Sequence, residues 1–134
     1  ERRSKATLEK ALAAAEQKEA NRLTEAERKA AVKRAAQMLA EKTAHFAKEM
    51  GVTYGRITIR EQKTRWGSCS SAGNLNYNWK LVLMPEHVMD YVVIHELAHR
   101  KEMNHSARFY AVVAQQMPDY KVWQSWLKEH GREY

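Results

Sequence analysis

The sequence contains few features that could fix a fold covalently or anchor it in a bilayer. It has one cysteine, Cys69, and two prolines among 134 residues. A single thiol cannot form an internal disulfide, so a disulfide framework is excluded and a reducing compartment such as the cytoplasm is expected. No uninterrupted apolar run approaches the roughly 18 residues that a membrane-spanning helix needs. We therefore expect a chain of ordinary domain size with its own core and no membrane partner.

Charge of one sign is not concentrated anywhere in the chain. The net charge is +7, from 23 Lys and Arg against 16 Asp and Glu, and the excess is shared almost evenly between the first 50 residues and the rest. Such a balance can favour acidic partners, including a weak association with nucleic acid. A solvated basic surface explains the same charge equally well.

The first 52 residues have the composition of a helical extension. Residues 5–20 are rich in Ala, Glu and Lys, which are strong helix formers. Thr24 and Glu27 have the spacing of a capping box, and Gly51 is a plausible helix stop. Between them, apolar residues recur at helical spacing, namely Ala31, Val32, Ala35, Leu39, Phe46 and Met50. We predict a helical hairpin, or one interrupted helix, over residues 1–52.

The pattern changes at residue 53, where we place the start of a second unit that runs to residue 134. Period-two alternation predicts strands at 56–60, 66–69 and 75–81, and the turn residues 70–74 predict that the last two form a hairpin. Helices follow, with Pro85 in the first turn of one, a cap at Ser106 and a final helix that ends at Gly131. Asn104 is an expected helix end, because Asn tolerates the left-handed conformation. The expected fold is α+β, with a small three-stranded antiparallel sheet packed on a central helix.

The segment His95-Glu96-Leu97-Ala98-His99 lies inside that central helix. Residues four apart lie on one helix face, one turn above the other, so His95 and His99 can share a metal ion. Glu96 then lies beside the metal, where its carboxylate can take a proton from metal-bound water. Without a metal, two histidines and a glutamate would be an odd insertion into an otherwise apolar helix.

A catalytic zinc site usually has a third protein ligand and an open fourth position. His105 is the best candidate, because the chain can turn near Asn104 and bring it back over the metal. The metzincin signature has the same separation, but it has Gly where this chain has Glu102. Glu102 remains an alternative third ligand.

Several separated motifs occur together in order: KTRWGSCS at residues 63–70, GNLN at 73–76, DYVVIHELAH at 90–99, NHS at 104–106, and Phe109. Together they resemble the YgjP-like metallopeptidases, which are related to SprT-like and other minimal HExxH proteases. The resemblance spans roughly residues 55–131 and departs at Tyr110, where a Trp is expected after Phe109. It implies a minimal gluzincin-like domain with one Zn²⁺ held by His95, His99 and His105, and with Glu96 as general base. It also implies that a substrate strand lies along the edge of the sheet.

Three further residues are candidates for contacts with the substrate or the transition state. Arg65 could stabilise an oxyanion, and Tyr77 and Tyr110 are weaker candidates for that role. A surface ion pair for Arg65 and ordinary packing for the tyrosines explain them equally well.

The spacing of the motif predicts a zinc-dependent hydrolase, and the resemblance implies peptide or protein as the substrate. Two alternatives stay open. One is a nucleic-acid-associated protein, or a protease that acts on DNA-bound proteins, and the other is a zinc hydrolase of a non-peptide amide. The sequence does not indicate an oligomeric state.

Overall fold

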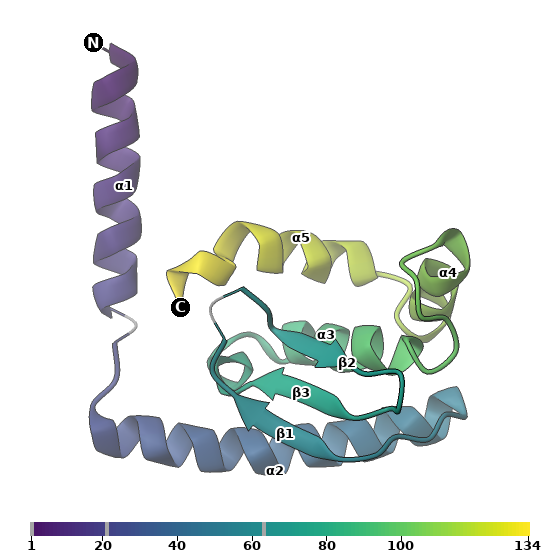
Figure 1. The fold of residues 1–134 in the computed structure, drawn as a ribbon. Coiled ribbons are helices and arrows are strands. Elements are labelled where there is room, and N and C mark those ends of the chain that lie inside the picture. Colours follow the sequence, from purple (N-terminus) through teal and green to yellow (C-terminus); the bar gives the residue numbers. More distant parts are fainter. Residues whose placement is uncertain (1, 21, 63) are drawn as a thin grey trace.

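The computed structural model describes residues 2–20, 22–62 and 64–134, and it has the predicted α+β class (Figure 1). In chain order the elements are α1 (Arg2–Ala20), α2 (Glu25–Met50), β1 (Ile57–Arg60), β2 (Gly67–Cys69), β3 (Leu75–Asn78), the 3-10 helix η1 (Trp79–Leu83), α3 (Glu86–Ala98), α4 (Ala107–Gln116), α5 (Tyr120–His130) and the 3-10 helix η2 (Gly131–Glu133). No described helix is long and apolar enough to cross a membrane.

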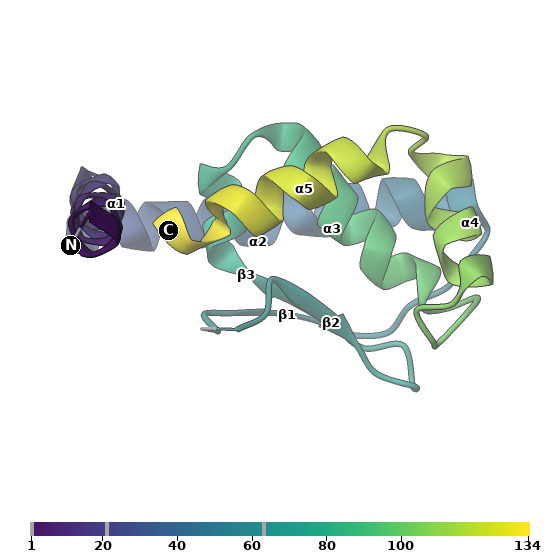
Figure 2. The ribbon, with the colours of Figure 1, turned by 90° about the horizontal axis from the view of Figure 1, so that it is seen from above.

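Helix α2 begins and ends where the sequence predicts. The Thr24 side chain accepts a hydrogen bond from the backbone N–H of Glu27, whose carboxylate accepts one from the Thr24 N–H. Such a cap contributes about 1 kcal/mol. Gly51 closes the helix in the left-handed conformation, at φ 69°. The predicted helical hairpin is wrong, because α1 leaves the body at a steep angle and does not lie along α2 (Figures 1 and 2). Leu8 and Leu12 of α1 are exposed.

Helix α2 packs its small and apolar face against η1 and α3. Its buried side chains recur about once per turn, at Ala31, Ala35, Leu39, Thr43, Ala47 and Met50. An ion-pair cluster also joins α2 to α3, because Lys42 Nζ lies 2.6 Å from Asp90 and 2.8 Å from Glu86. The core of the protein therefore crosses the predicted boundary at residues 52 and 53.

The sheet is mixed, whereas the sequence led us to expect a fully antiparallel one. The strand order is β1-β3-β2, with β2 antiparallel and β1 parallel to β3. The predicted hairpin of β2 and β3 is confirmed, with its turn closed by backbone hydrogen bonds among Ser70, Gly73 and Asn74. Strand β1 returns along α2 and takes the free side of β3 (Figure 1). Turn residues fix the hairpin locally, but alternation alone does not say on which side or in which direction β1 joins it.

The third strand ends earlier than predicted, because its last residues form η1. The Asn78 side chain accepts a hydrogen bond from the Lys80 N–H and caps this 3-10 turn. Trp79 and Leu81 are buried in the core. The alternation that predicted a strand up to residue 81 therefore reflects core packing and not strand pairing.

Helix α3 is the centre of the molecule. It contacts α2, β2, α4, α5 and η1, and it is buried on nearly every side. It ends at Ala98, earlier than the predicted end at Asn104, and residues 99–101 continue as turns. No described residue other than glycine has a positive φ, so the chain turns at Asn104 without the left-handed conformation that we expected there.

Candidate active site

Helix α3 places His95 and His99 on one face, as their spacing predicts, with ring centroids 5.4 Å apart. His99 is buried and His95 is partly buried. The loop after α3 brings His105 to the same place, so that one ligand atom from each of His95, His99 and His105 lies within 4.8 Å of the others. Glu102 does not belong to this cluster. The three histidines therefore converge, although one of them comes from outside the helix.

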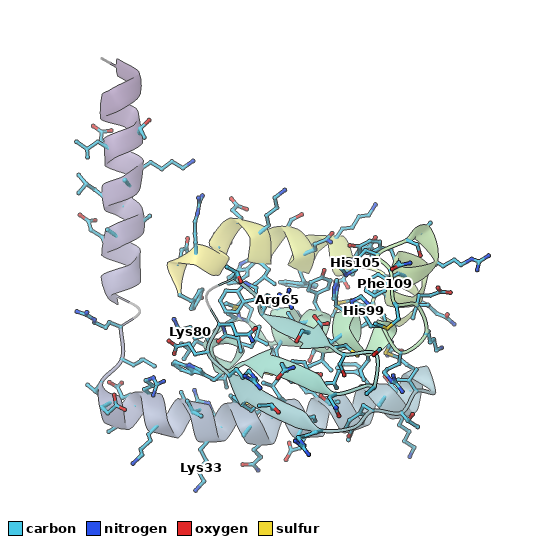
Figure 3. The ribbon with its side chains drawn as sticks, in the orientation of Figure 1. Lys33, Arg65, Lys80, His99, His105 and Phe109 are labelled. Carbon is cyan, nitrogen blue, oxygen red and sulfur yellow. The ribbon has the colours of Figure 1, made fainter. Side chains whose placement is uncertain are left out.

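Phe109, from the first turn of α4, packs against all three imidazole rings, and Figure 3 shows it close to His99 and His105. Its ring centroid lies 4.9 Å from that of His95, 4.5 Å from His99 and 5.0 Å from His105. The Ser106 side chain accepts a hydrogen bond from the Phe109 N–H and caps α4 beside the cluster. The predicted cap at Ser106 thus fixes both the loop that carries His105 and the ring of Phe109.

The environment of His95 and His99 favours their neutral form. Burial lowers the pKa of His95 to about 4, and the neighbouring His99 and His105 add to the shift. Burial and His105 also lower the pKa of His99, while the backbone carbonyls of Met103 and Glu102 oppose the change. Neutral imidazole is the form that offers a lone pair to a metal.

The donor set fits a zinc ion. His99 Nε2 and His105 Nε2 lie 3.2 Å apart. Two ligands at 2.0–2.1 Å from a tetrahedral zinc are about 3.3–3.4 Å apart, so this pair already has nearly the spacing of one tetrahedral edge. Three imidazoles are also the ligand set of one known class of catalytic zinc site.

Glu96 lies beside this nitrogen cluster and not within it. Its Oε1 is 4.0 Å from His99 Nε2, and the residue is only 6% exposed. Strand β2 covers it closely, since a Cβ added at Gly67 would come within 3.0 Å of Glu96 Cγ. Burial raises the pKa of Glu96 to about 8, and the positive charge of Arg65 opposes the shift. A carboxyl with such a raised pKa is suited to take up and release a proton near neutral pH.

The three residues predicted to contact the substrate or the transition state lie in different surroundings. Arg65 is exposed just before β2, and its charge reaches Glu96 (Figure 3). Tyr110 is partly buried on α4, with its ring 6.2 Å from that of His105. Tyr77 lies in the core, where its hydroxyl is 3.0 Å from Thr43 Oγ1. Tyr110 is thus near the cluster and Arg65 acts on Glu96 through its charge, whereas the Tyr77 hydroxyl already has a partner inside the fold.

Sequence reasoning did not assign a role to Tyr91. Its hydroxyl lies 3.3 Å from His95 Nδ1, and burial raises the pKa of Tyr91 to about 12. The spacing of four residues between Tyr91 and His95 was a usable signal, because such residues meet on a helix face. For Gly67, a glycine inside a strand indicates close approach by another backbone or a substrate. It does not say that Glu96 is the neighbour, since this depends on how β2 is seated on α3.

Comparison with known proteins agrees with this geometry. The family model described as "YgjP-like, metallopeptidase domain" matches residues 2–130. Two solved structures are similar in fold. Abylysin of Pyrococcus abyssi, a metallopeptidase zymogen, is 23% identical with a TM-score of 0.61, over 68% of this chain and 93% of its own. Jannalysin of Methanocaldococcus jannaschii, also a metallopeptidase zymogen, is 18% identical with a TM-score of 0.59, over 68% and 94%.

At these identities the two structures support the fold alone, and no curated protein matches the chain. The family match covers nearly the whole chain and includes the histidine cluster and Glu96. The chain therefore belongs to the YgjP-like family of metallopeptidases, whose hydrolytic chemistry depends on a metal ion.

Proposed function

We propose that this protein is a zinc metallopeptidase that holds one Zn²⁺ through His95, His99 and His105 and uses Glu96 as general base. The observation that carries the proposal is the convergence of three imidazoles beside a buried carboxylate. Imidazole nitrogens suit zinc, and three protein ligands leave the fourth position open for chemistry.

Zinc bound there would polarise the scissile carbonyl, acidify the attacking water and, as a positive charge, favour the ionised form of Glu96. The Glu96 carboxylate accepts a proton from the attacking water and later donates it to the leaving amine. The apolar cover from Val92 and β2 fixes the position of the side chain and excludes bulk water from one side of it. Phe109 packs against the imidazole rings and restricts their movement.

The edge of β2 is the proposed binding site for the peptide backbone. Strand β2 pairs with β3 on one side, and among the described strands none covers its other side. An extended peptide can add to such an edge through main-chain hydrogen bonds. Arg65 and Tyr110 flank this region and are the proposed contacts for the developing oxyanion. Tyr77 is left out of the proposal because its hydroxyl faces Thr43.

The test is a pair of variants measured for zinc content and for cleavage of a peptide mixture by mass spectrometry. Glu96→Gln should bind zinc as the wild type does and lose turnover, because the amide cannot accept the proton. His105→Ala should weaken zinc binding, and His45→Ala, which changes an exposed histidine on α2, should leave both properties intact. Normal turnover by Glu96→Gln would refute the mechanism, and undiminished zinc in His105→Ala would refute the ligand set.

The finer expectations from composition stay predictions. These are weak association with nucleic acid, action on DNA-bound proteins or on a non-peptide amide, and a reducing compartment such as the cytoplasm. A panel of peptide and amide substrates, together with DNA titration at low salt, separates these alternatives.

A further inference from the structure

His95 has a hydrogen-bond partner on its own helix. Tyr91 precedes it by one turn, and its hydroxyl lies 3.3 Å from His95 Nδ1, with the ring centroids 5.7 Å apart. Tyr91 is 5% exposed. The phenol is therefore buried, and its oxygen points at Nδ1 of the His95 ring and not at Nε2.

The chemistry of imidazole gives this contact a consequence. A neutral histidine carries its proton on one ring nitrogen and a lone pair on the other. If Nδ1 carries the proton, the Tyr91 oxygen accepts its hydrogen bond and Nε2 presents a lone pair. If Nε2 carries the proton, that nitrogen cannot bind a metal. A phenol hydroxyl can donate or accept, but a metal on Nε2 leaves the proton on Nδ1, and the Tyr91 oxygen lies where it can accept that hydrogen bond. The contact thus supports the one tautomer in which Nε2 of His95 can be a ligand.

The other two histidines of the cluster have no equivalent side-chain partner among the described residues. Nδ1 of His99 is buried without a hydrogen bond of good geometry, although the backbone carbonyls of Met103 and Glu102 act on this ring. Nε2 of His99 and Nε2 of His105 face each other at 3.2 Å. Within the described part of the chain, His95 is therefore the member of the cluster whose Nδ1 has a side-chain partner.

We propose that Tyr91 is a positioning residue that sets the tautomer and ring orientation of His95 for metal binding. The proposal rests on the proposed function, since it takes His95 to be a metal ligand. Groups that orient metal-bound histidines in this way typically change affinity by roughly 10- to 100-fold when they are removed.

The experiment measures zinc affinity by competition with a chromophoric chelator for wild type, Tyr91→Phe and Tyr120→Phe. Tyr91→Phe keeps the ring and removes only the hydroxyl, and we expect roughly 10- to 100-fold weaker binding. Tyr120→Phe removes a hydroxyl from the neighbouring aromatic cluster, where Tyr120 stacks on Tyr110, and should keep the wild-type affinity. Wild-type affinity in Tyr91→Phe would overturn the proposal. Failure of the wild type itself to bind zinc would instead overturn the proposed function.

A second measurement does not depend on how the variant folds. The ¹⁵N chemical shifts of the imidazole nitrogens in the zinc-free wild type report the tautomer of each histidine. We expect His95 to carry its proton on Nδ1, and Tyr91→Phe, which removes the hydroxyl and keeps the ring, to shift the population toward Nε2. A wild-type His95 protonated mainly on Nε2 would refute the role of Tyr91.

Discussion

Replacing Gly67 by alanine tests how closely β2 must approach the helix that carries Glu96. A Cβ at this position would lie 3.0 Å from Glu96 Cγ, 3.1 Å from Val92 Cγ1 and 3.2 Å from the Asn76 carbonyl oxygen. Carbon atoms normally pack at about 3.5–4.0 Å, so the strand and the helix must separate by about half an ångström. Gly67 does not have a positive φ, so the effect of the substitution is steric and not conformational.

Two magnitudes follow from that displacement. Overpacking of this kind costs about 1–3 kcal/mol of unfolding free energy. A shift of about 1 Å at reacting groups can cost about 100-fold in rate, so half that shift at Glu96 should lower kcat about tenfold. Zinc affinity should stay at the wild-type level, because the three atoms nearest to the added methyl group belong to Glu96, Val92 and Asn76 and not to the histidines.

The assay combines denaturant unfolding, zinc titration and cleavage of a peptide that the wild type processes. Gly51→Ala is the matched control, since it strains a residue at φ 69° where a Cβ meets nothing within 4 Å. It should lose about 1 kcal/mol of stability and keep kcat. The reasoning fails if Gly67→Ala turns over substrate at the wild-type rate, or if Gly51→Ala loses as much activity as Gly67→Ala.

Two further perturbations have expected outcomes. Removal of zinc by a chelator should lower the unfolding free energy by about 4 kcal/mol relative to protein at a zinc concentration of about 1,000 times Kd. Calorimetry with and without the metal measures this difference, and equal melting temperatures would contradict it. Lys42→Met should destabilise the protein by about 1–3 kcal/mol, because it leaves Asp90 without its partner between α2 and α3. Burial alone would lower the pKa of Lys42, but its bonds to Asp90 and Glu86 outweigh burial and raise it. The contribution of this lysine to stability is therefore full below its ordinary pKa and is lost as the pH rises through the raised one. Alkaline unfolding curves should show that loss in the wild type and not in Lys42→Met.

The parts of the site that the sequence predicted depend on spacing along one helix. His95, Glu96 and His99 need only the geometry of α3 to be placed, and capping chemistry predicted both Thr24 and Ser106. His105 was placed through the loop that follows, although the turn is made without the expected left-handed residue at Asn104.

The parts that it did not predict depend on contacts between elements. The direction of β1 follows from its return along α2, and the role of Gly67 follows from the seating of β2 on α3. Neither relation has a fixed separation in the sequence. The burial of Tyr77 against Thr43 is of the same kind, because it joins residues of α2 and β3 that no local pattern connects.

The position of the domain boundary leads to a final prediction, in which α1 and α2 behave differently. A chain that begins at residue 22 should stay folded and bind zinc, because the described side chains of α1 at residues 7–16 are exposed. A chain that begins at residue 53 should not fold, because it loses the buried face of α2, including Leu39 and Met50. Removing one such side chain costs about 2–5 kcal/mol, and domains are stable by only about 5–15 kcal/mol. Circular dichroism and zinc titration of both truncations distinguish the two outcomes. A folded, zinc-binding chain from residue 53 would show that the boundary predicted from the sequence is also a boundary of folding, whereas its unfolding would assign α2 to the catalytic unit.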